Sequence, residues 1–196
     1  MKVILGQIAD IQIGYQVKGR IIQQADDTHS LVQTSDVNDA GEIAWEALAS
    51  FTPVRKGTDR YQLIDGDILF LAKGARRVAA VVRNPQPHTL AVSTFFILRV
   101  RNDAVCLPEF LAWYLNVAAR DDIAAIEQRG VTIPFVPKER LLQLEVELPT
   151  TATQRRIAAL DELMHRERQL TAQLLEQRTR LINTFAQRTL YDKGDN

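Results

Sequence analysis

A long stretch without glycine or proline, near the carboxyl end, is the feature that most constrains this chain. The stretch runs from Gln154 to about Arg188 and follows the dipeptide Leu148-Pro149. Three threonines precede or open it as candidate N-caps: Thr150, Thr151 and Thr153. The pattern predicts one helix roughly 50 Å long, at about 1.5 Å per residue. A chain of 196 residues does not need such a rod to close a core, so we interpret it as a spacer or a pairing surface.

Apolar residues recur along this helix with heptad spacing. If Ile157 takes heptad position a, six of the ten a and d positions are apolar. These six form the expected dimer or partner interface: Ile157, Leu160, Met164, Leu174, Leu181 and Phe185. A second stripe of Leu163, Leu170, Leu175 and Ile182 widens the face beyond a two-stranded seam. We therefore expect a second helix and a further surface to cover it. The alternative is an amphipathic helix that lies on its own domain.

Composition indicates one globular domain in front of the helix. About 150 residues remain there, which suits a single domain, and a hydrophobic content of 46% is enough for a core. The net charge is zero, so the whole-chain charge does not indicate nucleic acid. The single cysteine, Cys106, excludes a disulfide within the chain and a multi-cysteine zinc site. No signal peptide or membrane span is visible, so we expect a cytoplasmic protein.

Strand patterns dominate the globular part, and one pair of strands encloses a basic loop. Asp65-Gly66-Asp67 predicts a turn, residues 68–72 a strand and residues 78–82 the returning strand. The loop between them carries Lys73, Arg76 and Arg77. Further strands are predicted at 29–37 and 90–100, and a helix at 107–126. The mixture predicts an α+β fold.

Charge is unevenly distributed around this basic loop. No acidic residue occurs between Asp67 and Asp103, whereas six cations do: Lys73, Arg76, Arg77, Arg83, Arg99 and Arg101. Such a segment predicts a local positive field that suits DNA phosphates, and arginine or lysine can also read guanine edges. The alternative is a solvated hairpin whose cations pair with distant carboxylates.

The order of these segments resembles the specificity (S) subunit of Type I restriction–modification systems. In that family a strand ends in Leu-Pro and is followed by Glu-Gln and a basic-Ile pair. Here Leu148-Pro149 and Gln154-Arg155-Arg156-Ile157 match, with Thr153 in place of the usual Glu. The opening LGQIADI, the hairpin GDILF with its glycine loop, and the helix EFLAWYL also match the family.

The resemblance implies a division of the chain into a target recognition domain over residues 1–150, a spacer or dimerisation helix over 151–190 and a flexible tail over 191–196. The domain is expected to hold a twisted β-sheet, and the helix is expected to be coiled-coil-like. The loops that face DNA are expected to supply these contacts: Lys18, Arg20, Lys73, Arg76, Arg77, Arg129 and Thr132.

The resemblance also implies a role without catalysis. A typical S subunit has two recognition domains and two spacer helices, and this chain has one of each, so it resembles a half-subunit. Two copies could pair their helices antiparallel, and such a homodimer would read an interrupted palindrome in double-stranded DNA. The expected partners are methyltransferase (modification) subunits and restriction/translocase subunits, which carry the S-adenosylmethionine, ATP and Mg chemistry; this chain needs no cofactor or metal. The alternative is an orphan or decoy module that occupies modification subunits.

An enzyme in its own right is disfavoured by the missing motifs. The three histidines, His29, His88 and His165, have no metal-ligand spacing. We find no nucleophile elbow, no nuclease carboxylate cluster with a lysine and no methyltransferase signature. The Asp65-Gly66-Asp67 turn lacks the spacing of a calcium loop.

Overall fold

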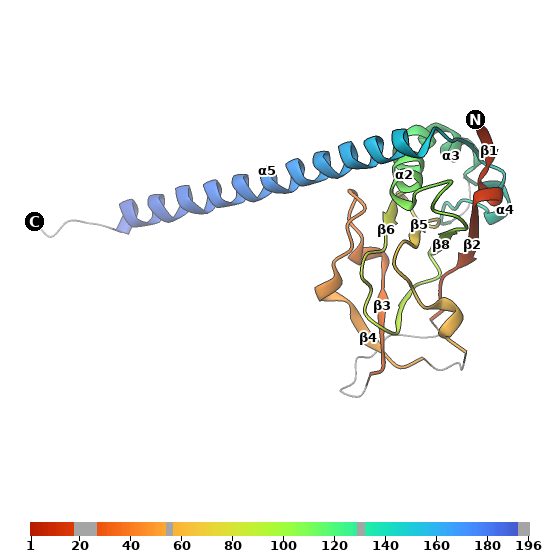
Figure 1. The fold of residues 1–196 in the computed structure, drawn as a ribbon. Coiled ribbons are helices and arrows are strands. Elements are labelled where there is room, and N and C mark those ends of the chain that lie inside the picture. The colour runs from red at the N-terminus through yellow and green to blue at the C-terminus, as the bar shows by residue number, and fades with distance from the viewer. Residues whose placement is uncertain (18–26, 54–56, 129–131, 192–196) are drawn as a thin grey trace, which may run out of the picture. The chain divides into compact units, whose positions relative to one another are not determined.

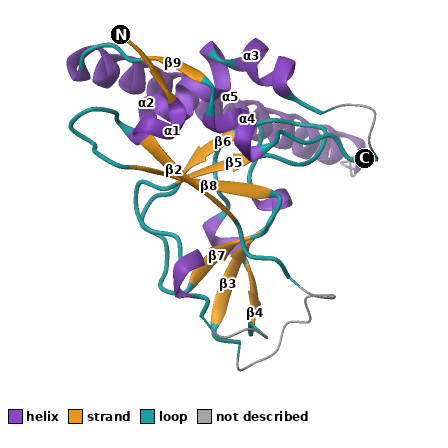
Figure 2. Cartoon of the chain, turned by 90° about the vertical axis from the view of Figure 1, so that its right-hand side faces the viewer, coloured by secondary structure: helices purple, strands orange, loops and turns teal. Residues whose placement is uncertain are grey.

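The computed structural model describes residues 1–17, 27–53, 57–128 and 132–191. The chain divides into two compact units, Met1–Ala158 and Ala159–Asn196. The predictions for Lys18, Arg20 and Arg129 lie outside the described residues. The first unit contains a four-stranded and a three-stranded sheet. Figures 1 and 2 show helices α1–α4 at one end of this unit, the sheet of β2, β8, β5 and β6 in the middle, and the sheet of β3, β4 and β7 at the opposite end.

The four-stranded sheet is antiparallel throughout and forms the middle of the first unit. Its strands lie in the order β2 (Ala9–Ile13), β8 (Phe95–Val100), β5 (Ile68–Leu71) and β6 (Ala79–Val81). All four residues of β5 are buried. This is expected for a strand with β8 on one side and β6 on the other that is covered on both faces. The predicted hairpin of residues 68–82 is therefore confirmed.

The three-stranded sheet corrects one sequence prediction. It contains β4 (Ala49–Phe51), β3 (His29–Val32) and β7 (Thr89–Ala91), with β3 parallel to β7. Residues 90–100 were predicted as one strand, but a turn at residues 93–94 separates β7 from β8, and the two strands join different sheets. The turn is closed by the hydrogen bond from Phe95 N–H to Val92 O, at 3.0 Å. A third sheet pairs β1 (Lys2–Ile4) with β9 (Glu145–Glu147), so the predicted single sheet is three sheets in the described part of the chain.

Gly14 lies where the two larger sheets meet. Its N–H donates to Phe95 O at 3.0 Å, and the next N–H, of Tyr15, donates to Ala91 O at 2.7 Å. A Cβ at position 14 would lie 2.4 Å from Val92 O and 2.6 Å from Ala91 O. Only glycine lets the backbone approach that closely.

The helical layer is built from short helices. They are α1 (Leu5–Ile8), α2 (Pro108–Trp113), α3 (Arg120–Ile126) and α4 (Lys138–Leu142), with a π-helical turn at Tyr114–Ala118 between α2 and α3. Among the described residues, 3-10 turns lie in the connections at η1 (Thr34–Asp36), η2 (Trp45–Ala47) and η3 (Asp59–Tyr61). The helix predicted for 107–126 is thus two helices joined by a wider turn. Its apolar side chains, Phe110, Leu111 and Leu115 among them, pack into the main core.

The long helix α5 (Thr151–Tyr191) is observed as predicted, three residues longer at each end. Thr150 caps its start, because the Thr150 hydroxyl accepts the N–H of Thr153 at 3.3 Å. The first turns belong to the compact unit Met1–Ala158, where Gln154 is buried and Ile157 packs against the main core. None of the helices that the structure describes has a stretch apolar enough to cross a membrane.

Candidate nucleic-acid interface

The five arginines of the acid-free segment are paired with carboxylates from other parts of the first unit. The pairs are Arg76–Asp39, Arg77–Glu127, Arg83–Glu109, Arg99–Asp67 and Arg101–Asp10. The segment is therefore not a bare positive patch. The sequence left open that these cations pair with distant carboxylates, and the five arginines do so. The DNA roles predicted for Arg76 and Arg77 stay predictions.

Arg76 and Arg77 fasten the basic loop to its neighbours. The Arg76 guanidinium donates to Asp39 Oδ1 at 2.7 Å, to Thr34 O at 2.6 Å and to Val37 O. The Arg77 guanidinium donates to Gly74 O at 2.7 Å and pairs with Glu127, and both partners of this ion pair are largely buried. Each side chain holds the shape of the loop that Lys73 begins.

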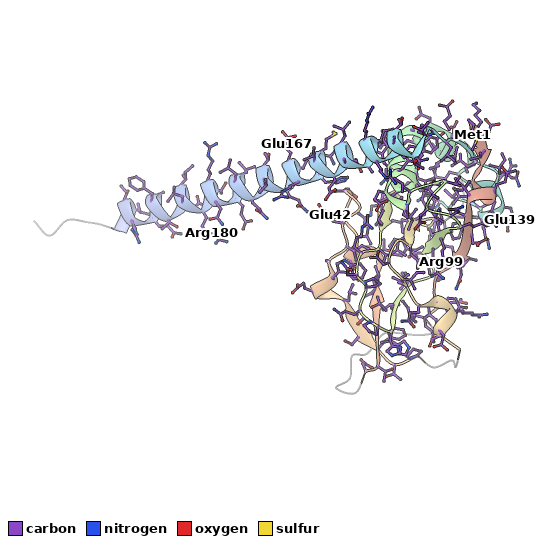
Figure 3. All side chains as sticks on the ribbon, viewed as in Figure 1. Met1, Glu42, Arg99, Glu139, Glu167 and Arg180 are labelled. Atoms are coloured by element: carbon purple, nitrogen blue, oxygen red, sulfur yellow. The ribbon has the colours of Figure 1, made fainter. Side chains whose placement is uncertain are left out.

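Arg99 makes the most enclosed of the other pairs. Its Nε and Nη2 donate to the two carboxylate oxygens of Asp67 at 2.7 and 2.8 Å, and the Asp67 side chain is fully buried. The same carboxylate accepts the N–H of Ile64 at 2.9 Å, and the hydrogen bond with Asp67 raises the pKa of Arg99. Figure 3 labels Arg99 on the four-stranded sheet.

Lys73 differs from these arginines, because its side chain is exposed and forms no ion pair with any residue in the described ranges. Its backbone is held firmly: its N–H donates to Thr94 O at 3.2 Å, and it forms an isolated bridge with Phe135. A lysine ammonium on a fixed backbone, free of carboxylates, is available to a phosphate.

The predicted contact Thr132 lies in a loop that adjoins Lys73. Gln128 pairs with Phe135 at the base of this loop, and Gly74 N–H donates to Pro134 O at 3.0 Å. Thr132 itself is exposed. The fold therefore brings the loop after β5 and the loop after α3 together, although about 60 residues separate them in the sequence.

Lys73 also borders a hollow of about 350 Å³ on the first unit. The residues around it are Ile13, Gly14, Tyr15, Gln16, Gly57, Thr58, Arg60, Tyr61, Lys73 and Ser93. Arg60 is exposed; its guanidinium lies 4.6 Å from the centre of the Tyr61 ring and donates to the Tyr61 hydroxyl at 2.7 Å. Two cations, a glutamine and two tyrosine rings around one hollow form a combination that can hold a phosphate and contact a base.

The floor of the hollow is aromatic and well packed. Tyr15 is buried and meets Tyr61 edge to face, with 5.6 Å between ring centres. At Thr58, another residue that lines the hollow, Oγ1 lies 3.3 Å from His29 Nε2. Burial and the neighbouring His88 lower the pKa of His29. Tyr61 thus packs against Tyr15 and also lines the hollow.

The sequence reasoning missed Arg60 and Gln16 as candidates. The available signal was weak: Arg60 stands directly before a tyrosine, and Gln16 follows Gly14-Tyr15. Only the fold shows that η3, the end of β2 and the start of the basic loop border one hollow.

Metal or thiol chemistry finds no support in the described part of the chain. No group of three or more His, Cys, Asp or Glu side chains there could hold a metal ion. Cys106 is fully buried, and desolvation raises the pKa of its thiol to about 12, so the reactive thiolate is scarce at neutral pH.

Comparisons with known proteins place the fold. No family model matches the sequence, and no curated protein matches it either. Solved structures do match. The S subunit of the Type I restriction–modification system from M. genitalium aligns with a TM-score of 0.64 and 15% identity, over 96% of this chain and 45% of that one. The HsdS subunit from Thermoanaerobacter tengcongensis aligns with a TM-score of 0.60 and 21% identity, over 100% of this chain and 51% of that one.

A third match comes from a structural study of complex assembly and conformational transition in the Type I R-M system. It has a TM-score of 0.65 and 18% identity, and covers all of this chain and 51% of the other. The chain thus spans about half the length of the solved proteins that it matches. The α+β fold, with its long carboxyl-terminal helix, is the fold of one half of a Type I specificity subunit.

Proposed function

We propose that this chain is a half-length, non-catalytic DNA-recognition subunit of a Type I restriction–modification system. The observation that carries the proposal is the similarity of fold over the whole chain to about half of several S subunits. The exposed cations Lys73 and Arg60 beside a polar and aromatic hollow support a nucleic-acid ligand.

A half-length specificity subunit, with one recognition domain, would recognise one half of a two-part target. Two copies joined through their long helices would present two equivalent recognition domains, and a two-fold dimer reads an inverted repeat. The proposed target is therefore an interrupted palindrome. The dimer would direct methyltransferase and restriction subunits to it in the cytoplasm, and those subunits would supply the S-adenosylmethionine- and ATP-dependent chemistry.

A selection experiment tests the DNA role. The purified full chain would be incubated with a library of random double-stranded DNA, and the bound fraction would be amplified and sequenced over several rounds. We expect two inverted half-sites with a constant spacer to become enriched. Binding without any enriched sequence would contradict a specificity subunit, and one isolated half-site would contradict the two-fold dimer.

Substitution of Lys73 tests the proposed site on the selected duplex. Lys73→Ala should weaken binding and reduce the slope of log affinity against log salt by about 1, because one phosphate contact releases about one counterion. The thermal unfolding midpoint of Lys73→Ala should equal that of wild type, since Lys73 is exposed and unpaired among the described residues.

The matched control is Arg140→Ala. It removes one exposed positive charge from α4, which does not border the hollow. Equal losses of affinity in the two variants, measured by fluorescence anisotropy, would mean that Lys73 acts only through net charge and that the hollow is not the contact surface.

A further inference from the structure

Large apolar side chains are exposed along the part of α5 beyond residue 158. Ten of them are between 53% and 71% exposed: Leu160, Leu163, Met164, Leu170, Leu174, Leu175, Leu181, Ile182, Phe185 and Leu190. An apolar surface of this extent on a helix marks an interaction site. The question is which partner the pattern fits.

The pattern is symmetric about the midpoint between Ala172 and Gln173. Counting outward from that point, each of the exposed large apolar residues in the amino-terminal half matches one in the carboxyl-terminal half. The matches are Leu160 with Phe185, Leu163 with Ile182, Met164 with Leu181, and Leu170 with Leu175. Leu174 matches Thr171, and Leu190 lies outside the symmetric set.

This symmetry is what an antiparallel pair of identical helices requires. If a two-fold axis crosses the helix at the midpoint, each residue lies level with its match on the second copy. Leu160 then meets Phe185, and Met164 meets Leu181, as a-to-d layers of a coiled coil. A heterologous partner would not need one half of the helix to mirror the other.

Two charged residues in the same stripe distinguish this antiparallel register from a parallel pair and from a shifted antiparallel register. Glu167 and Arg178 occupy a and d positions, match each other across the midpoint, and have no ion pair within the described residues. In the antiparallel register, Glu167 of each copy meets Arg178 of the other. In a parallel pair, Glu167 meets Glu167 and Arg178 meets Arg178. A shift of the antiparallel register by one heptad places Arg178 opposite Leu160 or Leu174 instead.

We propose that a second copy of this chain covers the face antiparallel to the first, in the one register that pairs Glu167 with the partner subunit's Arg178. The inference rests on the proposed function, in which two copies pair their helices antiparallel, and adds the register of that contact and the charged residues that select it. Apolar layers provide the attraction, and the Glu167–Arg178 layers select among apolar alternatives. The register fixes how the two long helices are related along their common axis.

Charge exchange tests the ion pair in the full chain. In the antiparallel register, Glu167→Arg alone places two arginines in each polar layer, and Arg178→Glu alone places two glutamates there. We expect each single variant to raise the dimer dissociation constant at least about ten-fold, because like charges are opposed within the contact. The double variant Glu167→Arg with Arg178→Glu should return close to wild type, as measured by analytical ultracentrifugation.

A parallel pair predicts a different result for the same three proteins. There each single exchange replaces one like-charged layer by another, so neither variant changes the dissociation constant strongly and the double variant rescues nothing. Singles equal to wild type would therefore overturn the register.

Disulfide trapping gives a second readout that does not depend on affinity. Met164→Cys and Leu181→Cys chains, mixed and oxidised, should form a cross-linked heterodimer, whereas Met164→Cys alone should not cross-link. In the antiparallel register two copies of position 164 are about 25 Å apart, at about 1.5 Å per residue, far beyond disulfide reach. The buried Cys106 does not compete.

Each outcome separates the inference from the proposed function. Cross-linking between two Met164→Cys chains would show a parallel dimer. That result would contradict the proposed register but not the proposed DNA role. A chain that is monomeric at every concentration would sink the self-pairing altogether. Failure to enrich any DNA sequence would instead overturn the proposed function, whatever the helices do.

Discussion

At the scale of single residues, the pairing of charges separates side chains that support the fold from side chains left for a ligand. Arg99 and Arg101, near the end of β8, have carboxylate partners that differ in burial. Arg99 faces the fully buried carboxylate of Asp67, whereas Arg101 faces Asp10, and both members of that second pair are about half exposed or more. A buried carboxylate depends on its partner much more than an exposed one does.

Arg99→Gln should therefore lower the free energy of unfolding by about 2 kcal/mol, because it leaves the buried Asp67 carboxylate without its bidentate donor. Arg101→Gln, the matched control, should cost at most about 1 kcal/mol, since exposed ion pairs contribute little. Urea unfolding of both variants, followed by circular dichroism, measures the difference. Equal losses would show that the Arg99–Asp67 pair is screened like a surface pair.

The sequence could not reveal these pairs. Arg101 and Asp10 are 91 positions apart, and Arg76 and Asp39 are 37 apart, so an acid-free stretch says nothing about the carboxylates that fold onto it. Lys73 was predicted as a contact together with Arg76 and Arg77, yet only the fold distinguishes the unpaired lysine from the two paired arginines. The DNA roles of all three remain predictions that binding measurements decide.

At the scale of elements, a buried glutamine attaches the first turn of α5 to the rest of the first unit. The Gln154 amide oxygen accepts the N–H of Leu107 at 2.9 Å, and its NH₂ group donates to Val105 O at 2.9 Å and to Pro149 O at 3.0 Å. One side chain thus satisfies three backbone groups that precede α2 and α5. Gln154 belongs to the short motif that carries the family resemblance, and this geometry gives a physical reason for glutamine there.

Gln154→Ala should lower the free energy of unfolding by about 2 to 3 kcal/mol, because the N–H of Leu107 and the carbonyl of Val105 lose their partner in a buried place. Gln173→Ala in the same helix is the control. Its side chain is exposed, so the change should be within about 0.5 kcal/mol of zero. Thermal and urea unfolding compare the two. A Gln154→Ala variant as stable as the control would show that water replaces the lost hydrogen bonds.

The elements differ in how far the sequence determines them. The long helix was predicted nearly in full, because thirty-odd residues without a breaker leave few alternatives and Thr150 caps it locally. Strands β7 and β8 were merged, because residues 90–100 are apolar on both sides of a turn and periodicity does not reveal which sheet each strand joins. Contacts between distant segments determine which sheet each strand joins. They also bring together the segments that line the hollow beside Gly14.

At the scale of the whole molecule, recognition of a two-part target depends on how strongly the two copies are held together. In the proposed function, a single copy contacts one half-site. In a dimer the second contact becomes intramolecular, with an effective concentration in the millimolar range, so joint binding can exceed single-site affinity by 10² to 10⁴. The exposed apolar face of α5 is the proposed source of this coupling.

Leu174→Glu combined with Leu181→Glu tests that coupling. Two charges per chain within the apolar face should convert the dimer to monomer, because buried carboxylates without partners are costly. The affinity for a duplex with both half-sites should then fall by about 10²-fold or more, whereas the affinity for a duplex with one half-site should stay unchanged.

Gln173→Glu with Gln187→Glu is the control: it adds the same charge at exposed polar positions of the same helix and should alter neither affinity. Sedimentation gives the mass, and anisotropy gives both affinities. If the monomeric variant bound the two-site duplex as tightly as wild type, each copy would recognise the full target alone, and the long helix would serve a different partner.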